Sequence, residues 1–194
     1  MRVRASAGIR WGTAGLVAAV TLWGAASANA QTGGSAVPGA PASSGSAPNS
    51  SPGGKPGRAT LTRKSGIAVA PAGAPQAVVN AIAAGNAIRK RPYVWGGGHG
   101  SFESGGYDCS GAVSYVLHAA GMLSSPLASG PLMSWGTPGK GRWISVMANP
   151  SHAYAVVAGL RFDTSSYGSG GSGPRWRWTK RKARGFAVRH AAGY

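Results

Sequence analysis

The sequence predicts an α+β fold, with helices near the N-terminal end of one small domain packed on a small antiparallel β-sheet. Two observations predict this class. Apolar residues recur at three- and four-residue spacing in the first part of the domain, over residues 76–121, as in helices packed on a core. Short apolar runs separated by turn residues follow, which is typical of antiparallel strands.

Residues 1–30 have the three parts of a secretory signal peptide. Three arginines give a positive start, an apolar run extends from Trp11 to Ala26, and small residues end the segment at Ala30. The run is short for a membrane span and is interrupted by glycines, so a cleaved signal is favoured over an uncleaved anchor. We therefore expect an exported protein that is periplasmic, secreted or associated with the cell wall.

Residues 31–75 consist mainly of Gly, Pro, Ser and Ala, with almost no large apolar side chain. Such a segment cannot bury enough surface to offset its ordering entropy, so a disordered tether is expected there. The remaining residues, 76–194, suit one domain that ends in a basic segment.

The chain has a net charge of +17 and only three acidic residues: Glu103, Asp108 and Asp163. This scarcity of carboxylates excludes several kinds of site. Paired carboxylates for glycoside hydrolysis and a calcium loop have too few candidates. The four histidines show no zinc-ligand spacing, so we expect no metal and no cofactor. A strongly basic exported protein is expected to bind polyanions such as wall teichoic acids or anionic lipids, whereas export argues against nucleic acid.

The first helix is expected over residues 76–91. Pro75 suits the first turn of a helix, and Pro92 ends the apolar pattern. A short extended aromatic segment and three glycines follow over residues 93–98. These glycines are expected to let the backbone turn tightly beside a bulky group.

The second helix is expected over residues 109–121, with one buried apolar stripe and Gly121 as its C-cap. Cys109 is the only cysteine and begins this helix. Exported proteins usually pair their cysteines, and a helix N-terminus stabilises a thiolate. A reactive thiol is therefore favoured over a structural cysteine.

Residues 122–151 are expected to be mostly loop. Four strands are expected in the second half of the domain, over 143–146, 152–157, 160–165 and 185–189. Ala158 and Gly159 form the turn between the second and third of these strands. The basic stretch 175–184 includes Trp176 and Trp178, whose rings are expected to be free to stack on sugars or bases.

A thiolate nucleophile needs a base and usually a third group that orients the base. The sequence has four histidines: His99, His118, His152 and His190. His118 is more than two helical turns from the cysteine, His99 is expected in a mobile loop, and His190 is near the end of the chain. His152 begins a buried strand that can hold its ring rigidly, so it is the predicted base, with a structural histidine as the alternative.

Three motifs carry a family resemblance: Tyr93-Val94-Trp95-Gly96-Gly97, then Asp108-Cys109-Ser110-Gly111 opening a helix that ends in Ala120-Gly121, then His152 opening an apolar strand. Together they resemble the NlpC family of papain-like cell-wall cysteine peptidases, over about residues 76–165. The resemblance implies a papain-like fold and thiol-dependent hydrolysis of amide bonds in peptidoglycan stem peptides.

The resemblance also implies roles for individual residues. Cys109 would be the nucleophile and His152 the base. The side chains that line the substrate cleft would be Tyr93, Asp108 and Ser110. The backbone amide of Cys109 would help to hold the oxyanion.

Two residues compete to orient His152. A two-residue turn pairs Val157 with Leu160 and puts Asp163 on the face of His152, whereas a three-residue turn presents Thr164. Counting along the family pattern favours Thr164, but a carboxylate would stabilise an imidazolium. We predict Asp163, with a surface salt bridge to an arginine as the alternative role.

The basic C-terminal segment, 175–189, is expected to retain the protein on anionic envelope polymers or lipid head groups, apart from the active site. We expect a monomer. Residues 141–144 lack the acidic residue that the family usually has before its histidine. A non-catalytic cationic wall-binding protein on the same fold is therefore the main alternative function, and a nucleic-acid-binding module is a third.

Overall fold

The computed structural model describes residues 56–165, 172–178 and 181–194. The predicted signal peptide, residues 1–30, lies outside the described residues, as does the tether over 31–55. No helix in the described ranges combines the length and the hydropathy that a bilayer span requires.

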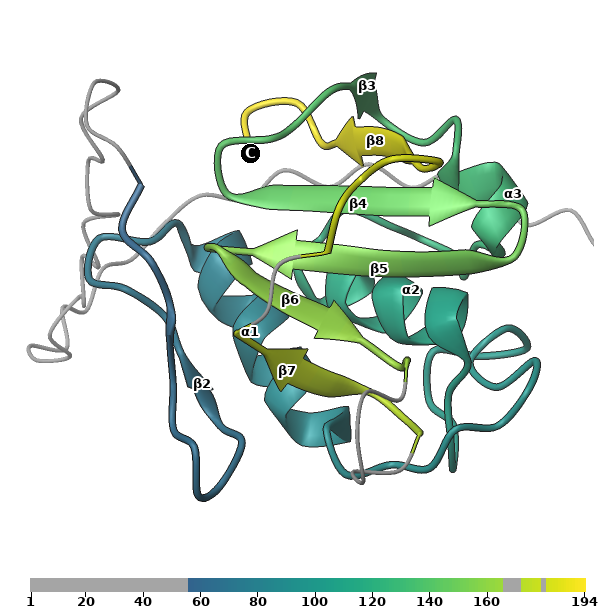
Figure 1. The fold of residues 1–194 in the computed structure, drawn as a ribbon, viewed down its shortest axis with the longest axis horizontal. Helices are drawn as coiled ribbons and strands as arrows, with labels where there is room; N and C mark the ends of the chain where they lie inside the picture. The colour runs from purple at the N-terminus through teal and green to yellow at the C-terminus, as the bar shows by residue number, and fades with distance from the viewer. Residues whose placement is uncertain (1–55, 166–171, 179–180) are drawn as a thin grey trace, which may run out of the picture. The chain divides into compact units, whose positions relative to one another are not determined.

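One antiparallel sheet of six strands forms the centre of the described domain (Figure 1). In spatial order its strands are β3 (Thr137–Pro138), β8 (Ala187–His190), β4 (Ile144–Asn149), β5 (His152–Val157), β6 (Leu160–Asp163) and β7 (Arg175–Arg177). The C-terminal strand β8 pairs with both β3 and β4, so the end of the chain is built into the sheet.

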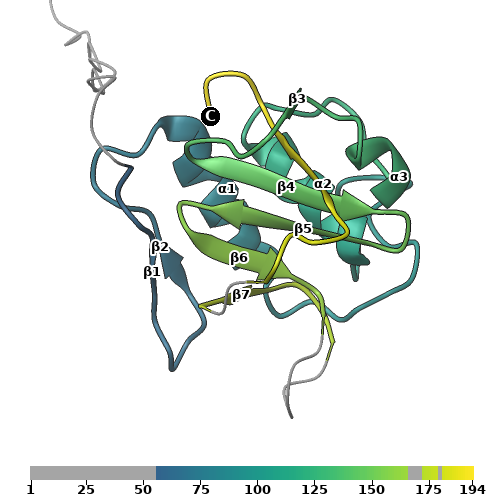
Figure 2. The ribbon, with the colours of Figure 1, turned by 45° about the horizontal axis from the view of Figure 1, so that its top comes forward.

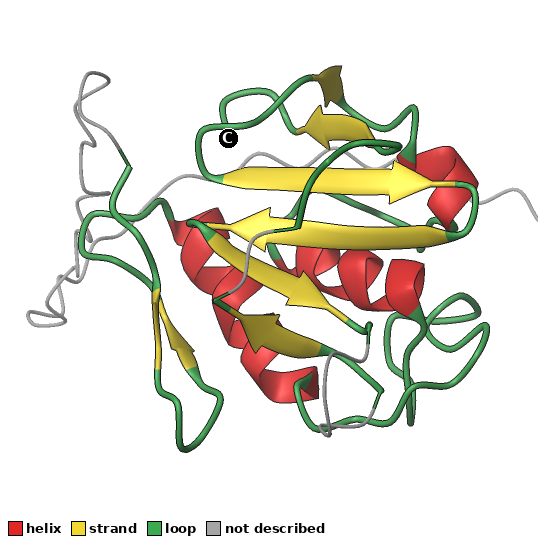
Figure 3. Ribbon diagram, in the orientation of Figure 1, coloured by secondary structure: helices red, strands yellow, loops and turns green. Residues whose placement is uncertain are grey.

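Two helices, α1 (Gln76–Ile88) and α2 (Cys109–Ala119), cover one face of this sheet (Figures 2 and 3). A short third helix, α3 (Ser129–Leu132), contacts β4 and β5. The predicted α+β class, with N-terminal helices packed on an antiparallel sheet, is confirmed.

Alternate residues of the central strands face the helices and form the core: Ile144, Val146, Ala148, Ala153, Ala155, Val157, Leu160 and Phe162. The residues between them face the other side of the sheet. Val157 pairs with Leu160, and both Ala158 (φ 45°) and Gly159 (φ 82°) have positive φ. This is the two-residue turn that puts Asp163 on the face of His152, as predicted from strand parity.

The helix ends follow from local hydrogen bonds. Helix α1 ends at Ile88, three residues earlier than predicted, with Arg89 as its C-cap. Helix α2 ends in a Schellman motif, because Met122 N–H donates to the Leu117 carbonyl at 2.9 Å and Gly121 N–H donates to the His118 carbonyl at 2.8 Å. Gly121 has a φ of 74°, which explains the glycine there.

The predicted tether is wrong for residues 56–75. These residues include a hairpin, β1 (Thr60–Leu61) with β2 (Ala68–Val69), that packs on α1. Ala59 and Ala68 are only 3% and 2% exposed. Small residues suffice to order this hairpin because its backbone is hydrogen-bonded by Asn86 of α1. The Asn86 side chain accepts from the Ala68 N–H at 2.9 Å and donates to the Ala68 carbonyl at 2.8 Å, and these bonds replace bonds to water.

The prediction for Trp176 is also wrong. Its ring is buried against Phe162, with ring centroids 4.7 Å apart, and its edge occupies the space where Gly85 has no side chain. A β-carbon on Gly85 would lie 2.4 Å from the Trp176 ring, so this glycine makes room for the indole. Trp178 is 48% exposed and keeps a free face.

Candidate active site

Cys109 is the first residue of α2, and the preceding aspartate caps the helix. The Asp108 carboxylate accepts a 2.7 Å hydrogen bond from the Gly111 N–H, which fixes the first turn of the helix at the cysteine. Cys109 is 8% exposed. Its sulfur therefore lies at the positive end of the helix dipole and largely out of water.

The glycine-rich segment 93–98 lies directly on this first turn. A β-carbon on Gly111 would come within 2.0 Å of the Gly97 carbonyl oxygen, and one on Gly98 would come within 2.8 Å of the Tyr107 ring. Gly96 N–H also donates to Asp108 at 3.2 Å. The predicted tight turn beside a bulky group is confirmed, and the group is Tyr107.

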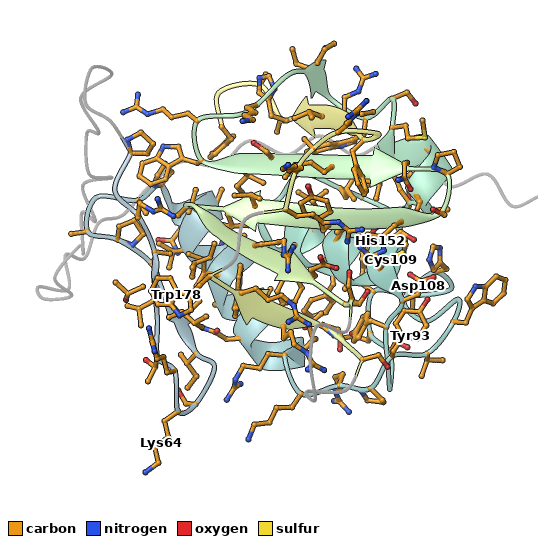
Figure 4. All side chains as sticks on the ribbon, in the orientation of Figure 1. Lys64, Tyr93, Asp108, Cys109, His152 and Trp178 are labelled. Atoms are coloured by element: carbon orange, nitrogen blue, oxygen red, sulfur yellow. The ribbon has the colours of Figure 1, made fainter. Side chains whose placement is uncertain are left out.

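His152, the first residue of β5, lies between the cysteine and an aspartate. Its Nε2 atom is 3.0 Å from Asp163 Oδ1, and its side chain interacts with the Cys109 thiol closely enough to lower the pKa of that thiol. Because Nε2 faces Asp163, Nδ1 is the ring nitrogen left for the sulfur. Figure 4 shows Cys109 and His152 side by side at the end of α2.

Two further groups contact the cysteine. The Ser129 hydroxyl, at the start of α3, lies 3.7 Å from the Cys109 sulfur, and the Ala153 backbone also hydrogen-bonds the sulfur. Nothing in the sequence singled out Ser129, which lies in a stretch rich in Gly, Pro and Ser twenty residues after the cysteine. Only the folded position of α3 identifies it.

Asp163 is buried, and several donors surround its carboxylate. Oδ1 accepts from the Ser165 N–H at 2.9 Å and from the Ser165 hydroxyl at 2.7 Å. Oδ2 lies 3.5 Å from both Arg161 Nε and Arg181 Nη1. The alternative of a surface salt bridge does not describe this residue, since its side chain is 0% exposed.

These contacts shift the ionisation of all three groups. Burial raises the pKa of the Cys109 thiol, but hydrogen bonds from His152, Ser129 and Ala153 outweigh it, so the net pKa is lowered. Burial lowers the pKa of His152, but Asp163 and Cys109 outweigh it and raise the pKa to about 9. Burial likewise opposes ionisation of Asp163, but His152 and Ser165 hold its pKa well below its usual range.

Near neutral pH the shifts give an imidazolium at His152 and a carboxylate at Asp163, and the lowered pKa of Cys109 favours its thiolate more than in a free thiol. A thiolate can attack a carbonyl carbon, and an adjacent imidazolium can protonate a leaving nitrogen. The geometry is therefore suited to nucleophilic attack on an amide or ester.

The residues predicted to line the cleft lie in two environments. Tyr93 is part of the exposed surface beside the site, and its pKa is raised by burial and by the charges of Cys109 and Asp108. Asp108 and Ser110 are buried instead and bind each other and His99, with Asp108 Oδ2 2.9 Å and Ser110 Oγ 3.2 Å from His99 Nε2. His99 lies in a loop, as expected, and its ring binds the Asp108 carboxylate rather than the cysteine.

Part of the basic C-terminal segment also belongs to the site. The Arg181 guanidinium lies over the rings of Tyr154 and Phe186, 5.5 and 5.1 Å from their centroids. It reaches Asp163 at 3.5 Å and donates to the Ser165 hydroxyl at 3.0 Å. The expectation that this segment is separate from the active site is therefore wrong for Arg181.

No protein-family model and no curated protein matches the chain. Among solved structures, the peptidoglycan hydrolase RipB of Mycobacterium tuberculosis is 23% identical, with a TM-score of 0.48, over 69% of this chain and 70% of RipB. A variant of the Resuscitation Promoting Factor Interacting protein RipA is 22% identical, with a TM-score of 0.45, over 73% of this chain and 71% of that one.

Proposed function

We propose that this protein is an exported thiol hydrolase that cleaves amide bonds in peptidoglycan stem peptides. One observation carries the reaction class: the Cys109 thiol, at a helix N-terminus, interacts with His152, whose Nε2 atom lies 3.0 Å from the buried Asp163. The substrate class rests on the resemblance of the motifs around Tyr93 and Cys109 to the NlpC family.

In the proposed reaction, the Cys109 thiolate attacks the carbonyl carbon of the scissile amide. The backbone N–H of Cys109 donates to the oxyanion that forms. The imidazolium of His152 gives its proton to the leaving nitrogen, the C–N bond breaks, and a thioester remains. Neutral His152 then takes a proton from water, the hydroxide oxygen attacks the thioester, and the acid and the thiolate are released.

Asp163 has a positioning role in this scheme. It accepts from Nε2 of His152 and so directs Nδ1 towards the sulfur. Ser165 and Arg181 hold the carboxylate in turn, at 2.7 and 3.5 Å. Since all these contacts are buried or half-buried, the orientation of the imidazole is fixed before a substrate binds.

The surface beside the cysteine suits a peptide. Tyr93, Val94 and Trp95 are 38%, 45% and 87% exposed and lie on the segment that packs on the first turn of α2. Exposed aromatic side chains provide apolar contact area at low entropic cost. We propose that this segment and the buried Asp108–Ser110 pair form one wall of the substrate cleft, and that the other exposed cations of 175–189 retain the enzyme on anionic envelope polymers.

The test is to incubate purified sacculi with the protein and to identify released peptides by mass spectrometry. Wild-type protein is expected to release stem-peptide fragments, and Cys109→Ala is expected to release none, because alanine cannot form the thioester. Circular dichroism and thermal unfolding check that the variant folds. Equal release by wild type and variant would overturn the proposal.

The same experiment separates the proposed function from the main alternative. A non-catalytic cationic wall-binding protein would sediment with sacculi but release no peptide in either form. Ser114→Ala controls for the effect of losing a buried polar side chain from α2, because its hydroxyl bonds the carbonyl and the N–H of Leu127, at 3.1 and 3.0 Å, away from the first turn. That variant is expected to keep peptide release.

A further inference from the structure

A cavity of about 470 Å³ lies on the face of the sheet opposite the helices, and shares only Arg161 and Arg181 with the groups around Asp163 in the candidate active site. Its floor is formed by outward-facing strand residues: Ser145, Met147, Val156 and Arg161. Its walls come from three parts of the chain: residues 56–58, residues 140–143, and Trp178 with residues 181–183. Neither Cys109 nor His152 lines it, and Trp178, which does, is well separated from both in Figure 4.

The cavity is strongly cationic. Six basic side chains line it, and no acidic side chain does: Arg58, Lys140, Arg142, Arg161, Arg181 and Lys182. Arg161 is 4% exposed and lies at the floor, whereas Arg58, Lys140 and Arg142 are exposed at the rim. Charges of one sign around a hollow with low-dielectric walls concentrate the field, so an anion is favoured inside.

Asp163 lies 3.5 Å from both Arg161 and Arg181, and at the rim the backbone oxygen of Tyr194 lies beside Gly141. One carboxylate thus faces two guanidinium groups, and it also accepts from His152 and Ser165. The cavity side of the cluster therefore keeps a net positive charge.

We propose that this cavity is a binding site for a phosphate group carried on a sugar, as in a phosphate-bearing glycan. Guanidinium groups match the geometry of phosphate oxygens and bind them with paired hydrogen bonds. Trp178 is 48% exposed and offers the aromatic face on which a sugar ring packs.

The shape of the site favours one sugar phosphate over a nucleic acid strand. A volume of about 470 Å³ is in the range of small-molecule sites. Single-stranded nucleic acids are bound instead along extended grooves with several successive stacking platforms. The exposed face of Trp178 is one platform, and the buried Trp143, also in the wall, is 8% exposed.

The test is a titration with glucose 1-phosphate at constant ionic strength, followed by the NMR signals of the tryptophan indole N–H groups. We expect saturable binding that shifts the signals of Trp143 and Trp178 and leaves that of Trp95 in place. Inorganic phosphate is expected to bind more weakly, and glucose is not expected to bind. Absence of saturable binding of glucose 1-phosphate would overturn the proposal.

The variant pair is Lys140→Gln with Arg142→Gln, against a charge-matched control, Arg63→Gln with Lys64→Gln. Lys64 is at the far tip of the β1–β2 hairpin, away from the cavity (Figure 4). The rim pair is expected to weaken binding by about tenfold, because two charged contacts are lost, and the control pair by less than about twofold. Equal weakening by both pairs would show a nonspecific effect of net charge and overturn the site.

Two more measurements complete the test. Arg58→Gln, from a different wall, is expected to weaken binding in the same way, so the outcome does not depend on one loop. A thymidine dodecamer is the comparison ligand. If it binds more tightly than glucose 1-phosphate, and the rim-pair variant weakens its binding by the same factor, the cavity is a nucleic-acid site and the proposal of a sugar phosphate is overturned. Peptide release from sacculi by the rim pair should persist, which separates this proposal from that of the hydrolase.

Discussion

The carboxylate of Asp163 connects most of the polar groups behind the candidate active site. It accepts from His152 and Ser165 and lies beside Arg161 and Arg181. Removing its negative charge would leave these cations facing each other and would remove the acceptor that orients the imidazole. Thr164, the next residue, is buried at 2% exposure, and its backbone carbonyl accepts from Gly173 at 3.2 Å.

Asp163→Asn is therefore expected to reduce the turnover of a soluble stem peptide by on the order of 10²–10⁴-fold, because the imidazolium loses its counter-charge. Thr164→Val, which has nearly the same volume, should change turnover by less than about fivefold. The measurement is the rate of peptide cleavage with both variants checked for folding. A larger loss of turnover in Thr164→Val than in Asp163→Asn would show that Thr164, not Asp163, orients the base.

Residue types and strand parity were enough to bring Cys109, His152 and Asp163 together in the prediction. The lone cysteine, a histidine that begins a buried strand and the two-residue turn at Ala158 and Gly159 each have a local signature. Ser129 and Arg181 have none. Ser129 reaches the site because α3 packs beside it, and Arg181 reaches it because the C-terminal segment folds back over the sheet. Sequence spacing contains no information on either contact.

At the scale of elements, the β1–β2 hairpin is held by the side-chain amide of Asn86 as well as by its own two-residue strands. Asn86 donates to and accepts from the backbone of Ala68, much as a neighbouring strand would. Composition does not reveal that such a segment is ordered. The prediction of order rests on large apolar side chains, whereas this hairpin buries alanines. The short strands β3 and β7 were missed for a related reason: their pairing is decided by partners far along the chain.

Asn86→Ala is expected to destabilise the domain by about 1–3 kcal/mol, because two backbone groups of Ala68 lose their partner. Denaturant unfolding gives this value, and limited proteolysis should show faster cleavage between residues 61 and 68. Gln76→Ala on the same helix is the control, since the Gln76 side chain donates to the Asn80 side chain on the surface, at 2.8 Å. Equal protease resistance of Asn86→Ala and wild type would contradict this account of the hairpin.

At the scale of the whole molecule, folding is coupled to the protonation of the His152–Asp163 pair. The pKa of His152 is raised from 6.5 to about 9, so its contribution to stability is full below pH 6.5 and is lost as pH rises through 9. The pKa of Asp163 is lowered from 3.8, so its contribution is full above pH 3.8 and is lost as pH falls through its folded-state value. Both contributions are complete only between these two limits.

In a Cys109→Ala background, which removes the titration of the thiol, the stability lost on adding Asp163→Asn is expected to be largest between about pH 4 and 6.5. It should shrink as pH rises above 6.5 through the folded-state pKa of His152, which Asp163 still raises in this background, and again below pH 3.8. Thermal unfolding across pH 3–10 measures it. A difference that does not vary with pH would mean that the pair is not coupled to folding.

Cys109, whose thiol pKa is lowered, also makes the protein sensitive to oxidants. A thiolate reacts with peroxide to give a sulfenic acid, which is usually protected by forming a disulfide with a second cysteine. Because this chain has one cysteine, the protecting disulfide has to form with a small external thiol. Brief exposure to peroxide should therefore abolish activity in a way that dithiothreitol reverses, whereas longer exposure should convert Cys109 irreversibly to the sulfinic acid, visible as two added oxygen atoms in the intact mass.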